Sequence, residues 1–145
     1  MNWIKWNNRK QLLDIKEPGI YFIALSEIEL TDKQFEYNKE IIYIGMSISK
    51  KGVLSRLSQF EKGMLGKDGT HGGAERVRFK HKNPVSFFEN IYICVKSFPL
   101  KQNDEVFNWK QKGECVKHEY ESFAEYLNNY GELPEFNDQK KSKKK

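Results

Sequence analysis

Cysteine, proline and long apolar runs are scarce in this chain, and each scarcity excludes a class of protein. The 145 residues include two cysteines and four prolines. Cys94 and Cys115 are too few for a disulfide framework and too widely spaced for a zinc site. The first residues lack the apolar run of a signal peptide, and no segment approaches the roughly 20 apolar residues of a membrane span. We therefore expect a reduced, cytoplasmic protein that is not a membrane protein, a secreted scaffold or a coiled coil.

Aromatic residues, in contrast, are plentiful at 14% of the chain. That fraction is too high for a disordered segment. A chain of this length can bury a core without help from disulfides or a structural metal. The sequence therefore predicts one folded domain over residues 1–139.

The positive charge of the chain is concentrated at its end. The formal net charge is +5 and the isoelectric point is about 9.1. Residues 140–145 contain five lysines and no acidic residue, so the remainder of the chain is neutral. We expect this basic tail to be disordered and to give solubility or non-specific contacts, because a terminal lysine run does not by itself read a specific target.

Three segments have the composition of β-strands, and two of them enclose a polar stretch. Residues 20–25, 41–45 and 90–95 are rich in β-branched and aromatic side chains. Pro18 and Gly19 end a short opening helix that reaches Ile15. The second strand has apolar residues on both faces and is predicted to be central. Residues 26–39 are polar and are expected to contain a short helical turn.

Two segments have helical periodicity. The helix that begins at Gly52 is marked by apolar residues three or four positions apart: Val53, Leu57, Phe60 and Met64. A glycine-rich stretch, residues 63–73, follows it. The last helix is predicted over about 114–129, with an inward stripe of Val116, Tyr120, Phe123 and Leu127. Together these elements predict an α+β fold, with a small central antiparallel sheet of about three strands flanked by helices.

Two tripeptides on the first two strands carry the functional signal. The first strand opens with Gly19-Ile20-Tyr21 and the second closes with Tyr43-Ile44-Gly45. Arg56 follows on the next helix, Glu119 lies on the last helix, and residues 134–137 read Pro-Glu-Phe-Asn. In this order the elements resemble the GIY-YIG nuclease superfamily. The 21 residues between Tyr21 and Tyr43 are more than members commonly have, so part of this segment is interpreted as an insertion.

The resemblance implies metal-dependent hydrolysis of DNA phosphodiester bonds. Tyr21 would activate or position the attacking water, and Tyr43 would assist it or bind the scissile phosphate. Arg56 would stabilise the developing charge, because its planar fork of donors matches phosphate oxygens. Glu119 would hold one divalent ion, Mg²⁺ or Mn²⁺, which suits carboxylate oxygens. Asn137 would close the site by hydrogen bonding.

Helical geometry distinguishes Glu119 from its neighbours. At about 100° per residue, Glu119 lies at about 300° from Val116, on the border of the predicted stripe. Glu114, Glu121 and Glu125 fall between about 140° and 180° and are predicted to face solvent. Without the resemblance, Glu119 would be read as an ordinary carboxylate at the edge of a helix.

The glycine-rich segment and its flanks supply candidate DNA contacts. Small residues allow close approach to a phosphate backbone, and basic side chains contact its oxygens. The candidates are Lys50, Lys51, Lys67, His71, Arg76 and Arg78. A plain surface loop explains the segment almost as well, and for His71 a position near the active site is the second interpretation.

The sequence thus predicts a small endonuclease of the restriction or mobile-element type. Loops, a homodimer or a partner protein would supply target specificity, since the chain has little room for a recognition domain. The alternative is a non-catalytic nucleic-acid-binding module with the same fold.

Overall fold

A four-stranded antiparallel sheet forms the centre of the molecule. The computed structural model describes residues 1–67 and 71–140, so the tail beyond Lys140 lies outside the described residues. The strands are β1 (Ile4–Lys5), β2 (Gly19–Leu25), β3 (Ile41–Ser47) and β4 (Ile91–Ser97), in the order β1-β4-β2-β3. The predicted α+β class and the three long strands are confirmed, and the short β1 adds a fourth.

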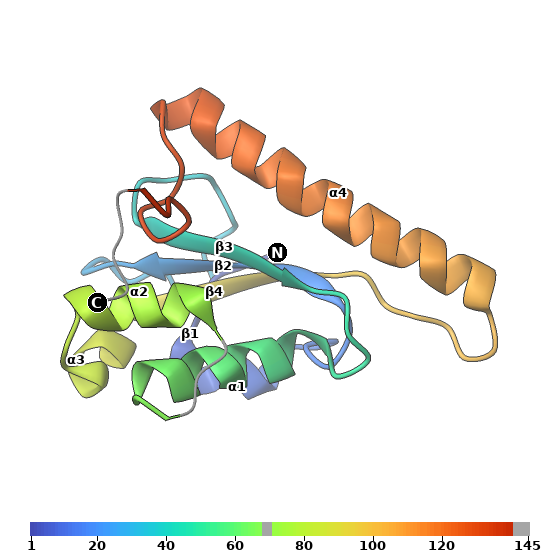
Figure 1. Ribbon diagram of the computed structural model, residues 1–145, viewed down its shortest axis with the longest axis horizontal. Coiled ribbons are helices and arrows are strands. Elements are labelled where there is room, and N and C mark those ends of the chain that lie inside the picture. The colour runs from blue at the N-terminus through green and yellow to red at the C-terminus, as the bar shows by residue number, and fades with distance from the viewer. Residues whose placement is uncertain (68–70, 141–145) are drawn as a thin grey trace.

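The prediction that the second strand is central is wrong, because β3 forms an edge of the sheet and β2 is the inner strand. Its apolar residues on both faces have another cause: helices cover both sides of the sheet at this edge (Figure 1). Residues 136 and 137 cover the outer backbone edge of β3, the edge that no other strand pairs with. The Phe136 N–H donates to the Ile42 carbonyl at 3.0 Å, and the Asn137 side chain bonds both the N–H and the carbonyl of Ile44 at 2.8 Å. This cover protects an edge that would otherwise be open to strand pairing.

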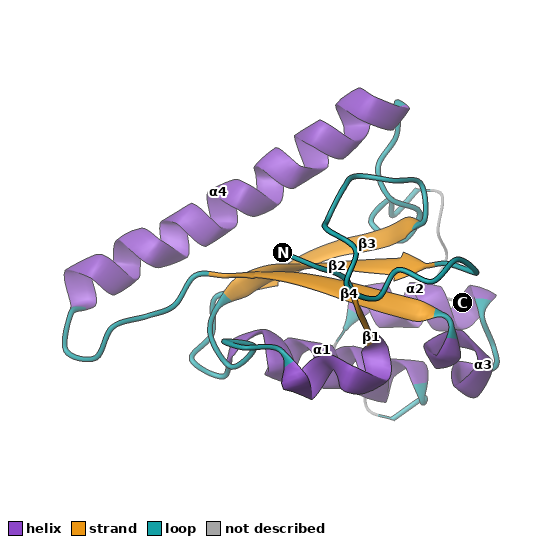
Figure 2. Ribbon diagram, turned by 180° about the vertical axis from the view of Figure 1, so that it is seen from behind, coloured by secondary structure: helices purple, strands orange, loops and turns teal. Residues whose placement is uncertain are grey.

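Helices form a layer on each face of the sheet (Figures 1 and 2). One layer holds the 3-10 helix η1 (Trp6–Gln11) and the helices α1 (Gly52–Met64), α2 (Gly72–Lys80) and α3 (Pro84–Glu89). The other holds α4 (Glu105–Tyr130), a single long helix. Among the described residues, no helix combines the length and apolar character needed to cross a membrane.

Helix α1 confirms its predicted period, since all four residues of its stripe are completely buried. The opening helix lies earlier than predicted: η1 ends at Gln11, and residues 12–16 form turns. Helices α2 and α3 are not predicted by the sequence pattern, because the glycine-rich stretch masks the start of α2 and only six residues form α3.

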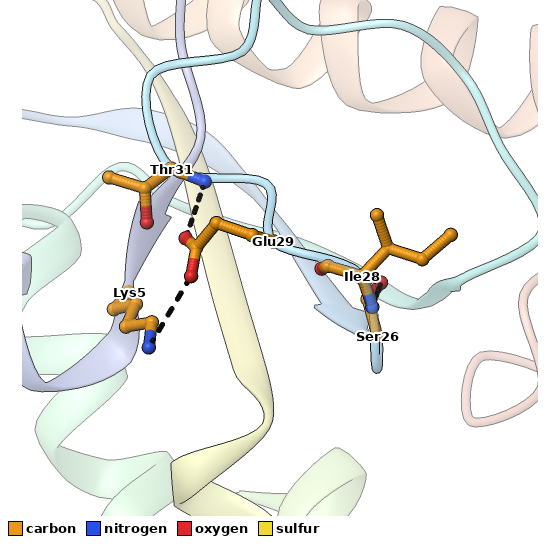
Figure 3. A network of polar contacts seen from close by, with 5 residues as sticks. All are labelled: Lys5, Ser26, Ile28, Glu29 and Thr31. Atoms are coloured by element: carbon orange, nitrogen blue, oxygen red, sulfur yellow. Dashed lines mark hydrogen bonds and ion pairs between the residues drawn. The ribbon is translucent and has the colours of Figure 1, made fainter.

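The long connection between β2 and β3 contains no helical turn; it packs against the start of the chain instead. Asn2 forms an isolated bridge with Gln34. The Glu29 carboxylate accepts a hydrogen bond from the Thr31 N–H at 3.0 Å and lies 3.6 Å from the Lys5 ammonium (Figure 3). The insertion is therefore an ordered cover over the β1 side of the sheet.

Helix α4 begins at Glu105 rather than near residue 114, and the predicted stripe is not its buried face. Tyr120 and Leu127 are 67% and 47% exposed. The buried residues are Cys115, Ser122 and Tyr126. At about 100° per residue the true face is turned by about 100° from the predicted one. Glu119 lies about 40° from Cys115 and therefore belongs to the side that faces the sheet.

Candidate active site

Tyr21 lies at the centre of the sheet and is fully buried. It pairs with Gly45 on the neighbouring strand β3, the last residue of the second tripeptide. A Cβ on Gly45 would lie 2.5 Å from the Tyr21 hydroxyl oxygen. The glycine is therefore needed at this position so that the tyrosine ring can lie over the neighbouring strand.

Tyr43 is half-buried on the same face and packs against α2. A Cβ on Gly73 would lie 2.5 Å from the Tyr43 ring, so α2 also approaches its tyrosine through a glycine. The Tyr43 ring centroid lies 6.2 Å from that of Tyr21 and 5.5 Å from that of His71. Burial raises the pKa of Tyr43, and the charges of Arg56 and Arg76 partly offset this.

His71 links α2 to Tyr21. It is the N-cap residue of α2: its Nδ1 accepts a hydrogen bond from the Ala74 N–H at 3.2 Å. Burial, followed by the charge of Arg56, lowers the pKa of His71 to about 3, so the imidazole is neutral. Since Nδ1 is an acceptor, the proton is assigned to Nε2 from this hydrogen-bond pattern. Nε2 lies 3.0 Å from the Tyr21 hydroxyl oxygen and donates to it.

Arg56 is the cation of the cluster. It is half-buried on α1, and its Nη1 donates to the Gln59 side chain at 2.7 Å. Burial raises the pKa of Tyr21, Tyr43 and Glu119, and the positive charge of Arg56 partly offsets this rise in each. Arg56 is therefore near enough to both tyrosines and to the carboxylate for its charge to act on all three.

Glu119 belongs to the opposite helical layer, and its charge acts on both Tyr21 and Tyr43. It is half-buried, and burial raises its pKa while the charge of Arg56 lowers it. Because β3 is the outer strand, a side chain of α4 can reach the tyrosine side around the edge of the sheet. Glu121, two residues later, is exposed and lies 3.8 Å from Lys117.

The donor set at Glu119 is sparse but suits magnesium. Among the described residues, no group of three or more His, Cys, Asp or Glu side chains could hold a metal ion. Mg²⁺ commonly keeps several waters and binds one or two carboxylates together with substrate phosphates. One carboxylate beside an arginine and two phenols therefore fits a cation that arrives with its waters and a phosphate, and does not fit zinc.

Tyr21 is a neutral phenol in this environment. Burial is the main cause that raises its pKa well above the ordinary value, and Tyr43 adds to it. Arg56 opposes this shift without reversing it. Of the two roles predicted for Tyr21, positioning a water fits this protonation state better than removing its proton.

The predicted DNA contacts divide into an exposed and a buried group. His71 is completely buried, and Arg76 is 8% exposed because its Nε donates to the Phe136 carbonyl at 3.0 Å. The expectation that these two contact DNA from the surface is therefore wrong, since one holds Tyr21 and the other holds the closing segment. The remaining four side chains are exposed and flank α1 and α2: Lys50, Lys51, Lys67 and Arg78.

Asn137 acts on the backbone rather than on the cluster. Both of its side-chain hydrogen bonds go to Ile44, the middle residue of the second tripeptide. It closes the site by fixing the strand that carries Tyr43. The sequence alone does not predict that the Tyr43 ring packs against Gly73. The signal that could have indicated it is the His71-Gly72-Gly73 run, which stands at the start of α2.

Comparisons with protein-family models, curated proteins and solved structures give no match for this chain. The function is therefore inferred from the cluster itself.

Proposed function

We propose that the protein is a metal-dependent endonuclease that hydrolyses DNA phosphodiester bonds. One observation carries the proposal: Tyr21, Tyr43 and His71 lie in contact from β2, β3 and the N-cap of α2, and the charges of Arg56 on α1 and Glu119 on α4 act on both tyrosines. A buried phenol, a cation and a partly desolvated carboxylate, brought together from so many elements, are the groups that phosphoryl transfer requires.

In this proposal Tyr21 orients the attacking water. Its oxygen accepts the His71 Nε2 hydrogen at 3.0 Å, so the phenolic hydrogen remains available to bond a water oxygen. His71 has no role as a base, because its Nδ1 already accepts the Ala74 N–H. It is a positioning residue that fixes the direction of the Tyr21 hydroxyl.

Arg56 and Tyr43 would contact the phosphate. The transition state carries more negative charge on the phosphoryl oxygens than the ground state, and a fixed guanidinium favours that change. The Tyr43 hydroxyl is a neutral donor for the same oxygens, because burial raises its pKa. Glu119 would hold a divalent ion, which when bound supplies a Lewis acid for the leaving oxygen.

The exposed basic residues beside α1 and α2 would hold the DNA backbone. Lys50 and Lys51 precede the first turn of α1, the helix that carries Arg56. Lys67 lies after the end of α1, and Arg78 lies on α2. Such contacts give affinity and orientation without sequence information.

A non-catalytic nucleic-acid-binding module is the second candidate. The exposed lysines would suit it equally well. The His71–Tyr21 contact argues against it, because a binding module has no need for a buried hydroxyl oriented by a neutral imidazole.

A plasmid assay distinguishes the two candidates. Supercoiled DNA is incubated with the protein in Mg²⁺, Mn²⁺ or EDTA, and nicked and linear products are measured. Tyr21→Phe removes only the hydroxyl, and Tyr92→Phe is the matched control, since Tyr92 is a strand tyrosine that is 4% exposed on the other face. We expect metal-dependent cleavage by wild type and Tyr92→Phe and its loss in Tyr21→Phe. Binding without cleavage in any metal would favour the non-catalytic module.

A further inference from the structure

A glutamine lies beside the cation of the candidate site. Gln59 follows Arg56 by three residues on α1, which places the two side chains about 60° apart around the helix. The Arg56 Nη1 donates a hydrogen bond to the Gln59 Oε1 at 2.7 Å, and both residues are half-buried. Gln59 is therefore a direct neighbour of the guanidinium that we assign to the phosphate.

The contact with Arg56 fixes which way round the Gln59 amide lies. Arginine has donors only, so the amide atom that faces it is the carbonyl oxygen. The Nε2 group, with its two hydrogens, then points away from the guanidinium, and no described residue accepts either hydrogen. In the described part of the chain, the buried side-chain nitrogen that lacks a partner is Nε of Arg9. Nε2 of Gln59 is therefore an unused donor that is open to solvent.

The charge of Arg56 is not cancelled by a neighbouring carboxylate. Helix α1 contains one acidic residue, Glu61, which lies about 140° from Arg56 around the helix and is paired with Arg9 of η1. None of the ion pairs between described residues includes Arg56. A glutamate at position 59 would form such a pair, because opposite charges three residues apart on a helix attract each other. The neutral glutamine holds the guanidinium and leaves its charge for a ligand.

We propose that Gln59 is a second phosphate-binding residue of the site. Its Nε2 donates to an oxygen of the DNA phosphate that Arg56 contacts, while its Oε1 holds the guanidinium in place. The proposal deepens the proposed function and rests on it, since the ligand is the phosphodiester backbone of DNA. A phosphate oxygen suits this position, because it accepts hydrogen bonds and both neighbouring groups donate them. Such contacts orient the strand without reading its sequence.

The two ends of the amide predict two different losses. The Nε2 contact exists whenever DNA is bound, so it contributes to affinity. The Oε1 contact acts through Arg56, so it contributes to the cleavage rate, because a group displaced by about 1 Å from its productive position can cost about 10²-fold. Removal of the amide should therefore weaken binding and also slow cleavage. Of these two losses, the slower cleavage alone should depend on the presence of the guanidinium.

Gln59→Met tests the phosphate contact in a binding assay that needs no cleavage. Methionine favours a helix as glutamine does and lacks both the donor and the acceptor. The Kd for duplex DNA in EDTA should rise about tenfold, as for the loss of a hydrogen bond to a charged group. The dependence of log Kd on log salt should keep its slope, because a neutral amide releases no counterion.

Gln111→Met is the matched control. Gln111 is also half-buried on a helix, and its Nε2 donates to the Pro99 carbonyl at 3.1 Å in the helical layer on the other face of the sheet. Each variant thus loses one side-chain hydrogen bond of a helical glutamine. Gln111→Met should bind DNA as wild type does. If Gln59→Met binds DNA as tightly as Gln111→Met, the proposal is overturned.

The Arg56→Lys background separates the two roles. Gln59→Met should weaken binding about tenfold in this background too, since the amide makes its own bond to the phosphate. It should slow cleavage at saturating DNA about tenfold in wild type and not at all beside Lys at position 56, where no guanidinium remains to be held. An unchanged Kd in the Arg56→Lys background refutes the phosphate contact, and rate losses that multiply refute the positioning of Arg56.

Failure of the nuclease proposal has a different signature. A wild type that binds DNA but cleaves none in Mg²⁺ or Mn²⁺ refutes the proposed function, and the Kd of Gln59→Met in EDTA then still decides the phosphate contact. A wild type that cleaves DNA, with a Gln59→Met variant that binds and cleaves equally well, refutes the role of Gln59 alone. A wild type that binds no DNA refutes both.

Discussion

Replacing Glu119 by glutamine separates the chemistry of the candidate site from its folding. The change is nearly isosteric and removes one charge from a half-buried position. Metal-dependent cleavage should fall by at least about 10²-fold, the usual loss when one preorganised electrostatic group is removed from an active site. DNA binding in EDTA should persist or tighten, because a carboxylate near the phosphate is removed.

The stability of this variant should change in the opposite direction. Burial raises the pKa of Glu119 in the folded protein above its ordinary value of 4.5. The folded state therefore binds the proton more tightly than the unfolded state does, and stability is lost as the pH rises through the folded pKa. A glutamine side chain does not titrate, so the Glu119→Gln variant does not lose this stability as the pH rises. The melting temperature of Glu119→Gln should equal that of wild type at pH 4 and exceed it at pH 7.

Glu121→Gln is the matched control. Its carboxylate is exposed and 3.8 Å from Lys117, and such surface pairs contribute about 0.3–0.5 kcal/mol. Cleavage across a Mg²⁺ titration and thermal melting at two pH values should both match wild type. If Glu121→Gln is the inactive variant, the placement of Glu119 at the site is refuted. If both variants cleave normally, a different group holds the metal.

Four further substitutions test the groups around the tyrosines. Arg56→Lys should lower cleavage by about 10²–10³-fold with an unchanged melting temperature, because a point charge cannot replace the planar fork; cleavage within a few-fold of wild type would reduce Arg56 to a packing role. His71→Gln should lower the free energy of unfolding, measured in urea, by about 2 kcal/mol, because the helix cap and the hydrogen bond to Tyr21 are lost. Because the pKa of His71 is lowered to about 3, wild-type stability should fall between pH 6.5 and 3 as the unfolded imidazole takes up a proton, and the variant should show a shallower fall over the same range. Gly45→Ala brings a Cβ to 2.5 Å from the Tyr21 hydroxyl oxygen, so it should destabilise the fold by about 1–3 kcal/mol and reduce cleavage; wild-type values for both would show that the close approach is not required. Asn137→Ala should cost about 2 kcal/mol for two hydrogen bonds, while cleavage at a temperature where the variant stays folded should remain within a few-fold; a complete loss there would give Asn137 a direct role.

The long strands and α1 could be predicted because their signals are local. Residues 20–25, 41–45 and 90–95 are β-branched and aromatic, and the α1 stripe has the helical period. The position of β3 at an edge could not be read from its composition, because the cover comes from residues 134–137, far away in sequence. An edge strand covered from outside has the same apolar pattern as an inner strand.

The residues that support the candidate site are harder to predict than those that form it. The two tripeptides and the order of the later motifs predict Tyr21, Tyr43, Arg56 and Glu119. His71 falls among the loop residues in the sequence, because the glycines around it hide α2. Its capping role depends on the backbone of Ala74, and its contact with Tyr21 joins residues 50 positions apart. For α3 a signal did exist: Asn83-Pro84 is an N-cap followed by a proline at the first helical position.

The error in the phase of α4 is the most informative disagreement. The apolar stripe predicts a side that faces the core, on the rule that the apolar side of a helix is turned inward. The buried face instead consists of Cys115, Ser122 and Tyr126, with the charged Glu119 beside them. A helix that contributes a carboxylate to a site cannot direct its most apolar stripe into the same space. The displaced stripe then faces solvent, and the same turn of the helix that directs Glu119 toward the sheet leaves Trp109 and Tyr120 71% and 67% exposed.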